Sequence, residues 1–363
     1  MERKLKLFVD PSWKRDGIHH IPLMHPFWGN PISREKTPFQ WQLFERHQFD
    51  NSYYELVNQI EEADMVLMPY SHNHATLFAP DVLARCIEAS QKSGKPLLID
   101  GVGDIERPIE IPNSYVIRYG GYRFEKHDHE IHIPPYADDL LLVYRGGELE
   151  VRHKSEKPSI SFAGWGKLTF MQALRAVLKE FPDRVKGFFD SRYRAKKKGV
   201  FFRTKAVSIL KESREVTANF LVRRSYSGNA HTAEKSQDEL RREFVDNLLG
   251  SDYALDVRGD ANASIRLFEI LSLGRIPIIV DTERNLPFSD VVDYKKFALI
   301  VDFRDLKKLP HMVAEFNRSL SDEQFVLMQK AAYEAFTEHF RVDKLMPHIV
   351  RELRLKGAFR DGS

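Results

Sequence analysis

Four polar residues between positions 253 and 294 have the types and spacing of a site for a phosphorylated ligand. Arg258 follows a short apolar run, and Ser264, Arg266 and Glu269 come soon after it. A guanidinium forms forked hydrogen bonds with phosphate oxygens, and a helix that starts near residue 264 adds free backbone N–H groups. A nucleoside diphosphate would be bound well there. The structural alternative is an ordinary surface Arg–Glu pair three residues apart on a helix.

The elements that must position these residues are those of half a doubly wound α/β unit. A strand is predicted over 253–257, then a polar turn, a helix that stops at Gly274 and a buried strand over 276–280. Asn262 or Ser264 would cap the start of the helix. Ligands bind where the parallel strands of such sheets end, so the polar turn lies where a site is expected.

The same stretch resembles the C-terminal signature of the exostosin family, glycosyltransferase family 47. The resemblance rests on RGDANASIRLFEILSLGRIPII at 258–279 and LPFSDVVDY at 286–294. It implies a GT-B fold of two Rossmann-like domains and transfer of sugars from nucleotide diphosphate donors with inversion. It also implies that the helix with Ser264, Arg266 and Glu269 holds the donor nucleotide, and that Glu269 accepts hydrogen bonds from the ribose.

The resemblance extends more weakly through the rest of the chain. The family has an apolar strand ending in His-Asp-x-Gly, and here Ile99 replaces the histidine while Asp100 remains. The family also begins its second domain with a strand and an F-x-G turn, like the strand predicted over 159–163 and the glycines Gly164 and Gly166. A loop at Gly164 can approach a phosphate or sugar closely, although the glycines could equally serve only to shape the turn.

The fold class expected is α/β, with two Rossmann-like doubly wound domains that face a cleft. Residues 1–150 would form the acceptor-side domain, residues 151–345 the nucleotide-sugar domain and residues 346–363 a C-terminal tail, with the charged segment 148–157 as linker. The other strands are predicted at 5–9, 64–68, 95–100, 216–222 and 298–302, and the other helices at 52–63, 80–93, 168–181, 234–249 and 321–340. A long loop over 12–42, rich in aromatic residues, is expected to be functional.

Chemistry at an anomeric carbon has two needs, positive charge for the departing diphosphate and a base for the attacking hydroxyl. Arg258 and Arg266 would meet the first need, with Arg223 and Arg224 at a strand end as helpers. The base is expected from the first domain, across the cleft. The candidates for it are Asp100, Asp104, Asp16 and His19. Asp100 and Asp104 are favoured because each follows a buried strand, although either could simply cap a turn.

Metal-independent chemistry without a cofactor is expected. The spacings His72-x-His74 and His127-x-His129-x-x-His132 could ligate zinc, but no cysteine or carboxylate follows at a matching interval. Surface or cleft histidines are the favoured interpretation. The Asp-x-Asp metal motif of A-type transferases is also absent from the sequence.

Composition sets limits on the class of protein. The 363 residues suit two domains of ordinary size, and the net charge of +3 is too small to indicate nucleic-acid or membrane binding. The N-terminus has no apolar segment long enough for a signal peptide or anchor, which predicts a cytoplasmic protein with no integral membrane segment and leaves room for peripheral association. The single cysteine, Cys86, fits a reducing compartment. The basic run at 192–198 is expected to be a solvated loop.

These observations predict a glycosyltransferase that moves a sugar from a nucleotide diphosphate donor, with UDP expected, to a glycan or polysaccharide acceptor. The alternative is an inactive relative that binds nucleotide sugars or glycans, because a fold and a donor pocket can outlast the loss of a base. A third class, a nucleic-acid protein that uses residues 192–198, is disfavoured. Kinase and phosphatase functions lack a P-loop or another nucleophile motif.

Overall fold

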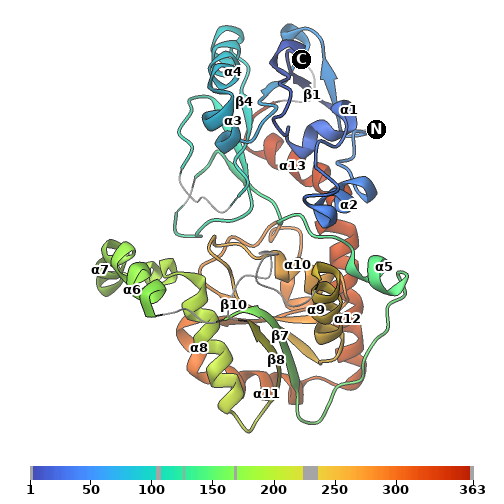
Figure 1. Cartoon of the computed structure of the whole chain (residues 1–363), viewed down its shortest axis with the longest axis vertical. Coiled ribbons are helices and arrows are strands. Elements are labelled where there is room, and N and C mark those ends of the chain that lie inside the picture. Colours follow the sequence, from blue (N-terminus) through green and yellow to red (C-terminus); the bar gives the residue numbers. More distant parts are fainter. Residues whose placement is uncertain (1–2, 104–107, 126, 167–169, 224–235, 360–363) are drawn as a thin grey trace.

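Two α/β domains, each built on a parallel sheet, make up the chain. The computed structural model describes residues 3–103, 108–125, 127–166, 170–223 and 236–359. The first domain lies above the second in Figure 1, and the red helices of the last part of the chain run alongside both. The expected fold class, two doubly wound domains of the GT-B type, is confirmed.

The first domain has a six-stranded sheet of order β2-β1-β3-β4-β5-β6, with every pair parallel. Its strands are β1 (Leu5–Phe8), β2 (Tyr54–Val57), β3 (Met65–Leu67), β4 (Leu97–Asp100), β5 (Ser114–Arg118) and β6 (Glu130–His132). Its helices are α1 (His25–Trp28), α2 (Pro38–Arg46), α3 (His72–Phe78), α4 (Pro80–Ser93) and α5 (Leu140–Arg145).

Local sequence signals explain several of these elements. Helix α4 starts with Pro80 in its first turn and stops at Gly94, whose φ of +71° is left-handed. All four residues of β4 are buried, as expected of a central parallel strand. The predicted helix over 52–63 is wrong, because Tyr54–Val57 pairs with β1 as a strand. The spacing of apolar residues in this segment is compatible with a helix or a strand. Pairing with the edge of the sheet at β1 favours the strand.

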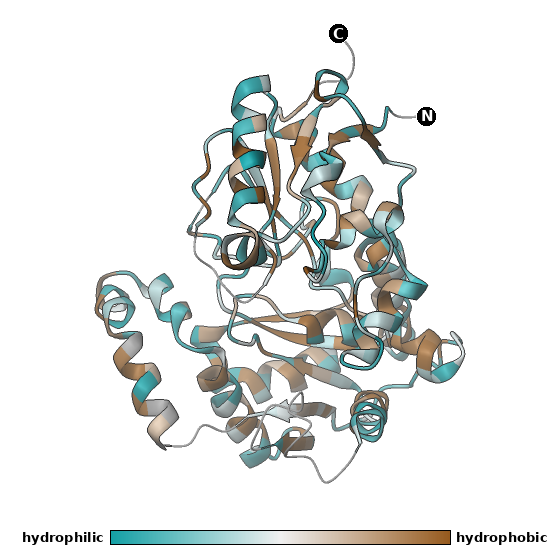
Figure 2. Ribbon diagram, turned by 45° about the horizontal axis from the view of Figure 1, so that its top comes forward, coloured by the Kyte–Doolittle hydropathy of each residue, from teal (hydrophilic) through white to brown (hydrophobic). Residues whose placement is uncertain are grey.

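The second domain has a five-stranded parallel sheet of order β11-β10-β9-β7-β8. Its strands are β7 (Ser159–Trp165), β8 (Thr217–Arg223), β9 (Tyr253–Asp256), β10 (Ile276–Asp281) and β11 (Leu299–Asp302). Its helices are α6 (Phe170–Lys179), α7 (Phe181–Phe189), α8 (Gly199–Glu212), α9 (Gln237–Leu249), α10 (Ile265–Leu271), α11 (Leu309–Ser319) and α12 (Asp322–Ala335). In Figure 2 the strands are mostly brown, and helices at the surface mix brown with teal.

The end of the chain returns to the first domain. After α12 and a π-helical turn at Phe336–Phe340, helix α13 (Leu345–Leu355) packs into the same apolar core as β1, β3 and β4. The segment treated above as a tail, 346–363, therefore begins with a helix that has a buried apolar face. Phe268 of α10 and Phe340 also join this core, with ring centroids 5.1 Å apart, so it extends across both domains.

The segment after β5 also ties the domains together. Tyr122 forms an antiparallel bridge with Arg284, and the Arg123 guanidinium lies 2.7 Å from the Asp281 carboxylate. Asn262 donates from Nδ2 to the carbonyl of Gly121 at 3.0 Å. These contacts set the distance between the two sheets on one side of the pocket described next. Within the described residues, no helix is both long and apolar enough to span a membrane.

Candidate active site

A pocket of about 850 Å³ lies between the two domains. The first domain lines it with α2, the loop after β4 and the segment 135–144. The second domain lines it with the ends of β7 and β8, with α9 and with residues 259–269. In a sheet of order 2-1-3-4-5, ligands bind where the strand order reverses, which is here between β7 and β9. The pocket lies at that position in the second domain.

Gly164 and Arg266 line the pocket on the side formed by the second domain. Gly164 has φ of +147°, and a Cβ atom there would lie 2.5 Å from Nη2 of Arg266. This Nη2 donates to the carbonyl of Ala163 at 2.8 Å, and the guanidinium stacks on Phe162 with 4.6 Å to the ring centroid. The end of β7 thus fixes the Arg266 side chain in the wall of the pocket.

Glu269 forms a buried ion pair that the sequence did not predict. Its Oε1 lies 2.7 Å from Nη1 of Arg241, and both side chains line the pocket. The Arg241 guanidinium, which comes from α9, also stacks on Phe244 at 5.3 Å. The guanidinium fixes the orientation of this carboxylate. The carboxylate oxygens have further lone pairs, which could accept hydrogen bonds from a ribose hydroxyl.

Ser264 lies at the start of α10, as predicted, but its hydroxyl does not cap the helix. It donates to Oδ1 of Asp256 at 2.5 Å, and Oδ2 of Asp256 accepts from Arg284 at 2.7 Å. This buried network fixes the turn between β9 and α10. Helix α10 has only seven residues, so its dipole contributes less to a bound diphosphate than the arginines do.

Arg258 is not part of the pocket wall, contrary to the sequence expectation. Its side chain is fully buried, and its guanidinium donates to the backbone carbonyls of Ala195, Lys197 and Asp260. The peptide of Gly259 lies so close to Gly199 that a Cβ there would be 2.1 Å from the Gly259 carbonyl. Arg258 therefore holds two backbone segments together and does not face a ligand in this structure.

The structure describes one of the two arginines that were predicted to help bind the diphosphate. Arg223 ends β8 and lines the pocket, with Nη2 at 3.5 Å from the Glu243 carboxylate. Arg224 lies outside the described residues. Arg203 of α8 also lines the pocket and donates from Nε to the carbonyl of Val257 at 3.0 Å. Arg203, Arg223 and Arg266, together with Arg241, give this side a cluster of four guanidiniums.

The first domain contributes aromatic side chains to the pocket. Tyr119 and Tyr136 line the pocket and contact each other edge to face, with 5.3 Å between ring centroids. Asp138 also lines it, and the Arg46 guanidinium lies 2.6 Å from its carboxylate. Tyrosine faces and hydroxyls suit a carbohydrate, which offers both C–H and O–H groups.

Among the base candidates that the structure describes, Asp100 lies close to this wall. It ends β4 and is buried, and burial together with the nearby Tyr119 and Asp100 raises the pKa of Tyr136. Its Oδ1 accepts from the backbone N–H of Val102 at 3.0 Å, and burial raises the pKa of Asp100 to about 7. Such a carboxyl group can both accept and release a proton near neutral pH. Asp100 itself does not line the pocket. Gly103, three residues further along the chain, does.

Of the other three candidates, two do not line the pocket and the third lies outside the described residues. Asp16 and His19 are exposed in the loop after β1 and do not line the pocket. Asp104 lies outside the described residues, directly after Gly103. Within the described part of the chain, no group of three or more His, Cys, Asp or Glu side chains is arranged to hold a metal ion.

Several pocket residues had no signal in the sequence. Arg203 and Arg241 lie within helices whose surrounding residues are ordinary for amphipathic helices, and only packing shows which face meets the cleft. Tyr119 and Tyr136 follow strands of the first sheet, so the rule that ligands bind at strand ends could have found them.

Comparison with known proteins finds a family that part of this site resembles. Residues 184–316 match the family model described as the Exostosin GT47 domain. This segment contains Arg223, Arg241, Ser264, Arg266 and Glu269 of the pocket. Over this segment the chain is similar to the exostosin family. The similarity is concentrated in the second domain, where the pocket has its arginine cluster and its Glu269–Arg241 pair.

Curated proteins similar to this chain match it over short segments. An exostosin-1 homolog of Caenorhabditis elegans is 27% identical over 120 residues, which cover 32% of this chain and 30% of that protein. The probable arabinosyltransferase ARAD1 of Arabidopsis thaliana is 36% identical over 64 residues, 18% of this chain and 14% of that one. The chain thus matches less than a third of the length of these relatives.

Two solved structures are similar at low identity. A glycosyltransferase from Rickettsia africae aligns with a TM-score of 0.38 and 11% identity, covering 81% of this chain and 77% of the other. The Anabaena protein HepE, solved in complex with UDP, aligns with a TM-score of 0.39 and 10% identity, covering 97% of this chain and all of the other.

Proposed function

We propose that this protein is a glycosyltransferase that moves a sugar from a nucleotide diphosphate donor to a glycan acceptor in the pocket between its domains. The observation that carries the proposal is that Arg266 and the Arg241–Glu269 ion pair line the same pocket as the tyrosines of the first domain. The family match and the names of the curated relatives support sugar transfer as the reaction.

The second domain would bind the donor. Arg266 and Arg223 would contact the diphosphate, and the narrow backbone at Gly164 would let it approach the end of β7. Glu269 would accept hydrogen bonds from the ribose while Arg241 holds its carboxylate in place. UDP is the first nucleotide to test.

The first domain would bind the acceptor, with Tyr119 and Tyr136 against its sugar rings. A hydroxyl of the acceptor attacks the anomeric carbon, the bond to the diphosphate oxygen breaks, and the hydroxyl proton passes to a base. Inversion follows from this single displacement. The guanidiniums would stabilise the negative charge of the leaving diphosphate, so the proposed reaction is metal-independent.

Asp100 is the base that we propose first. Its pKa near 7 suits proton uptake, and it lies three residues before Gly103, which borders the pocket. Asp104 remains the second proposal because it directly follows Gly103 in the sequence, and Asp16 and His19 rank after both because the segment between β1 and α1 that carries them contributes no residue to the pocket. Replacing Asp100 by Asn should lower kcat by about 10² to 10⁴ and leave donor affinity unchanged.

The donor can be identified by thermal shift. Nucleotides and sugar nucleotides are screened against the wild type, Glu269→Ala and the control Glu315→Ala, which removes an exposed carboxylate on α11. A donor at 100 times its Kd adds about 2.7 kcal/mol to the free energy of unfolding. The wild type and the control should be stabilised, and Glu269→Ala should not, each measured against its own unliganded Tm.

A transfer assay then separates the enzyme from a binding protein. The stabilising donor is incubated with a broad panel of glycans, and products are resolved by chromatography. Donor binding without turnover on any glycan would favour the inactive relative, for which the burial of the Asp100 carboxylate is the structural argument. A cytoplasmic site of action is part of the proposal, in keeping with the buried free thiol of Cys86.

A further inference from the structure

Helices α6 and α7 turn their apolar stripes towards solvent. They lie beside the second domain at the left of Figure 1. In α6 the exposed residues Met171, Leu174 and Leu178 recur at helical spacing. In α7 the exposed Phe181, Val185 and Phe188 do the same, and Phe189 follows. A surface helix of a soluble domain normally turns such a stripe towards the core.

The exposure is largest at the end of α7. Phe188 and Phe189 are 81% and 90% exposed. Single exposed apolar residues are ordinary, but seven on two adjoining helices are a concentration of the kind that marks an interaction site. The interdomain pocket does not explain them, because none of its described lining residues lies between positions 166 and 199.

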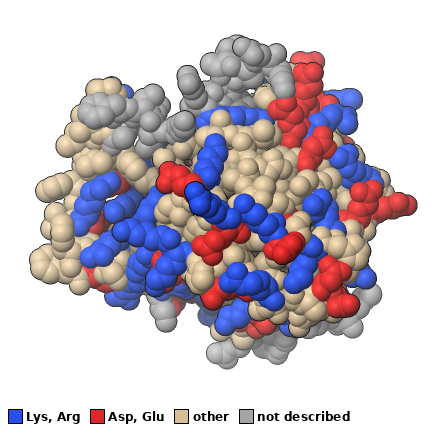
Figure 3. All heavy atoms as spheres, turned by 90° about the horizontal axis from the view of Figure 1, so that it is seen from below, with Lys and Arg blue, Asp and Glu red and all other residues tan. Residues whose placement is uncertain are grey.

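Positive charge accompanies this apolar surface. Residues 181–198 contain seven Lys or Arg and two Asp, a net charge of +5, whereas the whole chain has a net charge of +3. The segment includes α7 and the 3₁₀ segment Ser191–Lys196 that packs against it. Figure 3 shows blue side chains gathered at the left of the molecule, the side on which α6 and α7 lie.

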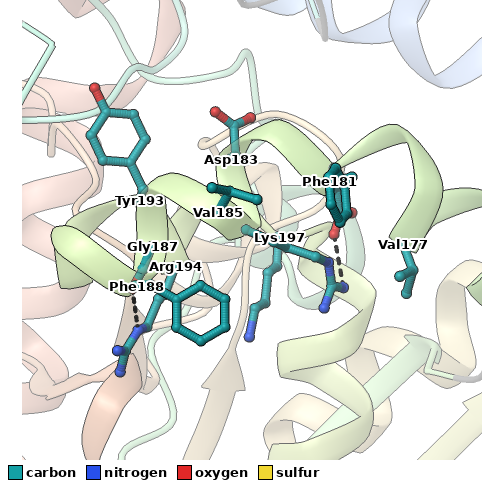
Figure 4. Close-up of a pocket in the computed structure, with 11 residues that line it drawn as sticks. Val177, Phe181, Asp183, Val185, Gly187, Phe188, Tyr193, Arg194 and Lys197 are labelled. Atoms are coloured by element: carbon teal, nitrogen blue, oxygen red, sulfur yellow. Dashed lines mark hydrogen bonds and ion pairs between the residues drawn. The ribbon is translucent and has the colours of Figure 1, made fainter.

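The close-up shows how the two kinds of side chain are arranged. A hollow of about 520 Å³ lies between the end of α6, α7 and the 3₁₀ segment. In Figure 4, Phe188, Arg194 and Lys197 point to one side and the carboxylate of Asp183 points to the opposite side. Burial and the nearby Arg184 and Arg194 guanidiniums lower the pKa of Lys197. Cations crowded in this way favour an anionic group beside them.

We propose that α6, α7 and the 3₁₀ segment Ser191–Lys196 dock on the surface of a membrane that contains anionic phospholipids. The apolar stripes would enter the boundary between headgroups and acyl chains, and the Lys and Arg side chains would contact lipid phosphates. Apolar aromatic residues with adjacent Lys and Arg are the combination that binds such interfaces. This inference does not depend on the proposed sugar transfer.

The charge also argues against a second copy of the chain as the occupant. In a twofold dimer each patch would face the same patch, so two segments of net charge +5 would be brought together. Like charges placed opposite each other across an interface cost several kcal/mol. An anionic lipid surface has the complementary sign.

The test uses the full chain and vesicle sedimentation. Wild-type protein should sediment with vesicles of phosphatidylcholine and phosphatidylglycerol, and not with vesicles of phosphatidylcholine alone. Binding should weaken as salt is added. Phe188→Ser combined with Phe189→Ser should weaken binding by about tenfold or more, because two exposed aromatic side chains lose their burial in the interface.

A matched control removes apolar surface elsewhere. Leu327 of α12 and Leu355 of α13 are 61% and 67% exposed, and replacing both by Ser should leave vesicle binding unchanged. A charge variant, Lys186→Gln with Arg192→Gln, should weaken binding about tenfold. All these positions are exposed, so the variants should keep the Tm of the wild type.

Three results would overturn the proposal. The first is a wild type that fails to bind the anionic vesicles or binds neutral ones equally. The second is a phenylalanine variant that binds as the wild type does. The third is analytical ultracentrifugation that finds a wild-type dimer and a monomeric phenylalanine variant, which would assign the patch to a second copy of the chain.

Discussion

Gly164 leaves the space that the guanidinium of Arg266 occupies. A Cβ atom on Gly164 would lie 2.5 Å from Nη2 of Arg266, closer than such atoms can approach. The glycine's φ of +147° also disfavours any other residue there. Two positions that are about a hundred residues apart in the sequence are thus matched to each other at the pocket wall, and the match can be tested at either of them.

Replacing Gly164 by Ala should displace Arg266 and strain the end of β7. We expect the free energy of unfolding to fall by about 1–3 kcal/mol and donor affinity to fall about tenfold or more. Urea denaturation and calorimetry with the donor measure the two effects. Gly166→Ala is the control, because its Cβ would meet a methyl group of Val222 at 3.2 Å and a ring carbon of Phe162 at 3.6 Å, and no guanidinium. Equal losses in both variants would contradict the role given to Gly164.

The Arg241–Glu269 pair should behave as a coupled unit. Arg241→Met leaves the Glu269 carboxylate buried without its ionic partner, which should cost about 3–5 kcal/mol of stability. Adding Glu269→Gln to that variant should recover part of the loss, because the charge is then removed as well. A double-mutant cycle in urea denaturation gives the coupling. Additive losses would show that the two side chains do not interact.

Arg258 should matter for stability and not directly for the ligand. Arg258→Met removes the donors to three backbone carbonyl groups and leaves the buried one of Ala195 unsatisfied, so we expect the free energy of unfolding to fall by about 2–4 kcal/mol. Donor affinity of the folded fraction should stay within about threefold of the wild type. Urea denaturation and calorimetry separate these effects. Unchanged stability with lost donor binding would instead place Arg258 on the diphosphate.

Asp100 should make stability depend on pH. Its pKa of about 7 in the folded state lies above the ordinary value of 3.8, so the folded protein holds a proton that the unfolded chain releases. The contribution of this group therefore falls as pH rises from about 4 to about 7, by on the order of 4 kcal/mol in total. Asp100→Asn should remove that slope, measured as the difference between variant and wild type in urea denaturation across the range. Parallel curves would show that the carboxyl group is ionised when folded.

Short-range patterns in the sequence predicted much of the second half of the pocket. The run around residues 253–280 predicted β9, α10 and β10 nearly at their observed bounds, because apolar periodicity and a glycine stop are local properties. The signature also identified Ser264, Arg266 and Glu269. The glycines after β7 were interpreted as a place where a phosphate or sugar could approach the backbone closely.

The tertiary structure alone decided which partners these side chains meet. Arg258 turns inward because carbonyls some sixty residues earlier in the chain come within reach of its guanidinium. Glu269 meets Arg241 because α9 and α10 pack beside each other. Residues 54–57 are a strand because β1 offers them an edge. Local pattern fixes which face of an element is apolar, whereas contacts between distant segments depend on how those faces pack together.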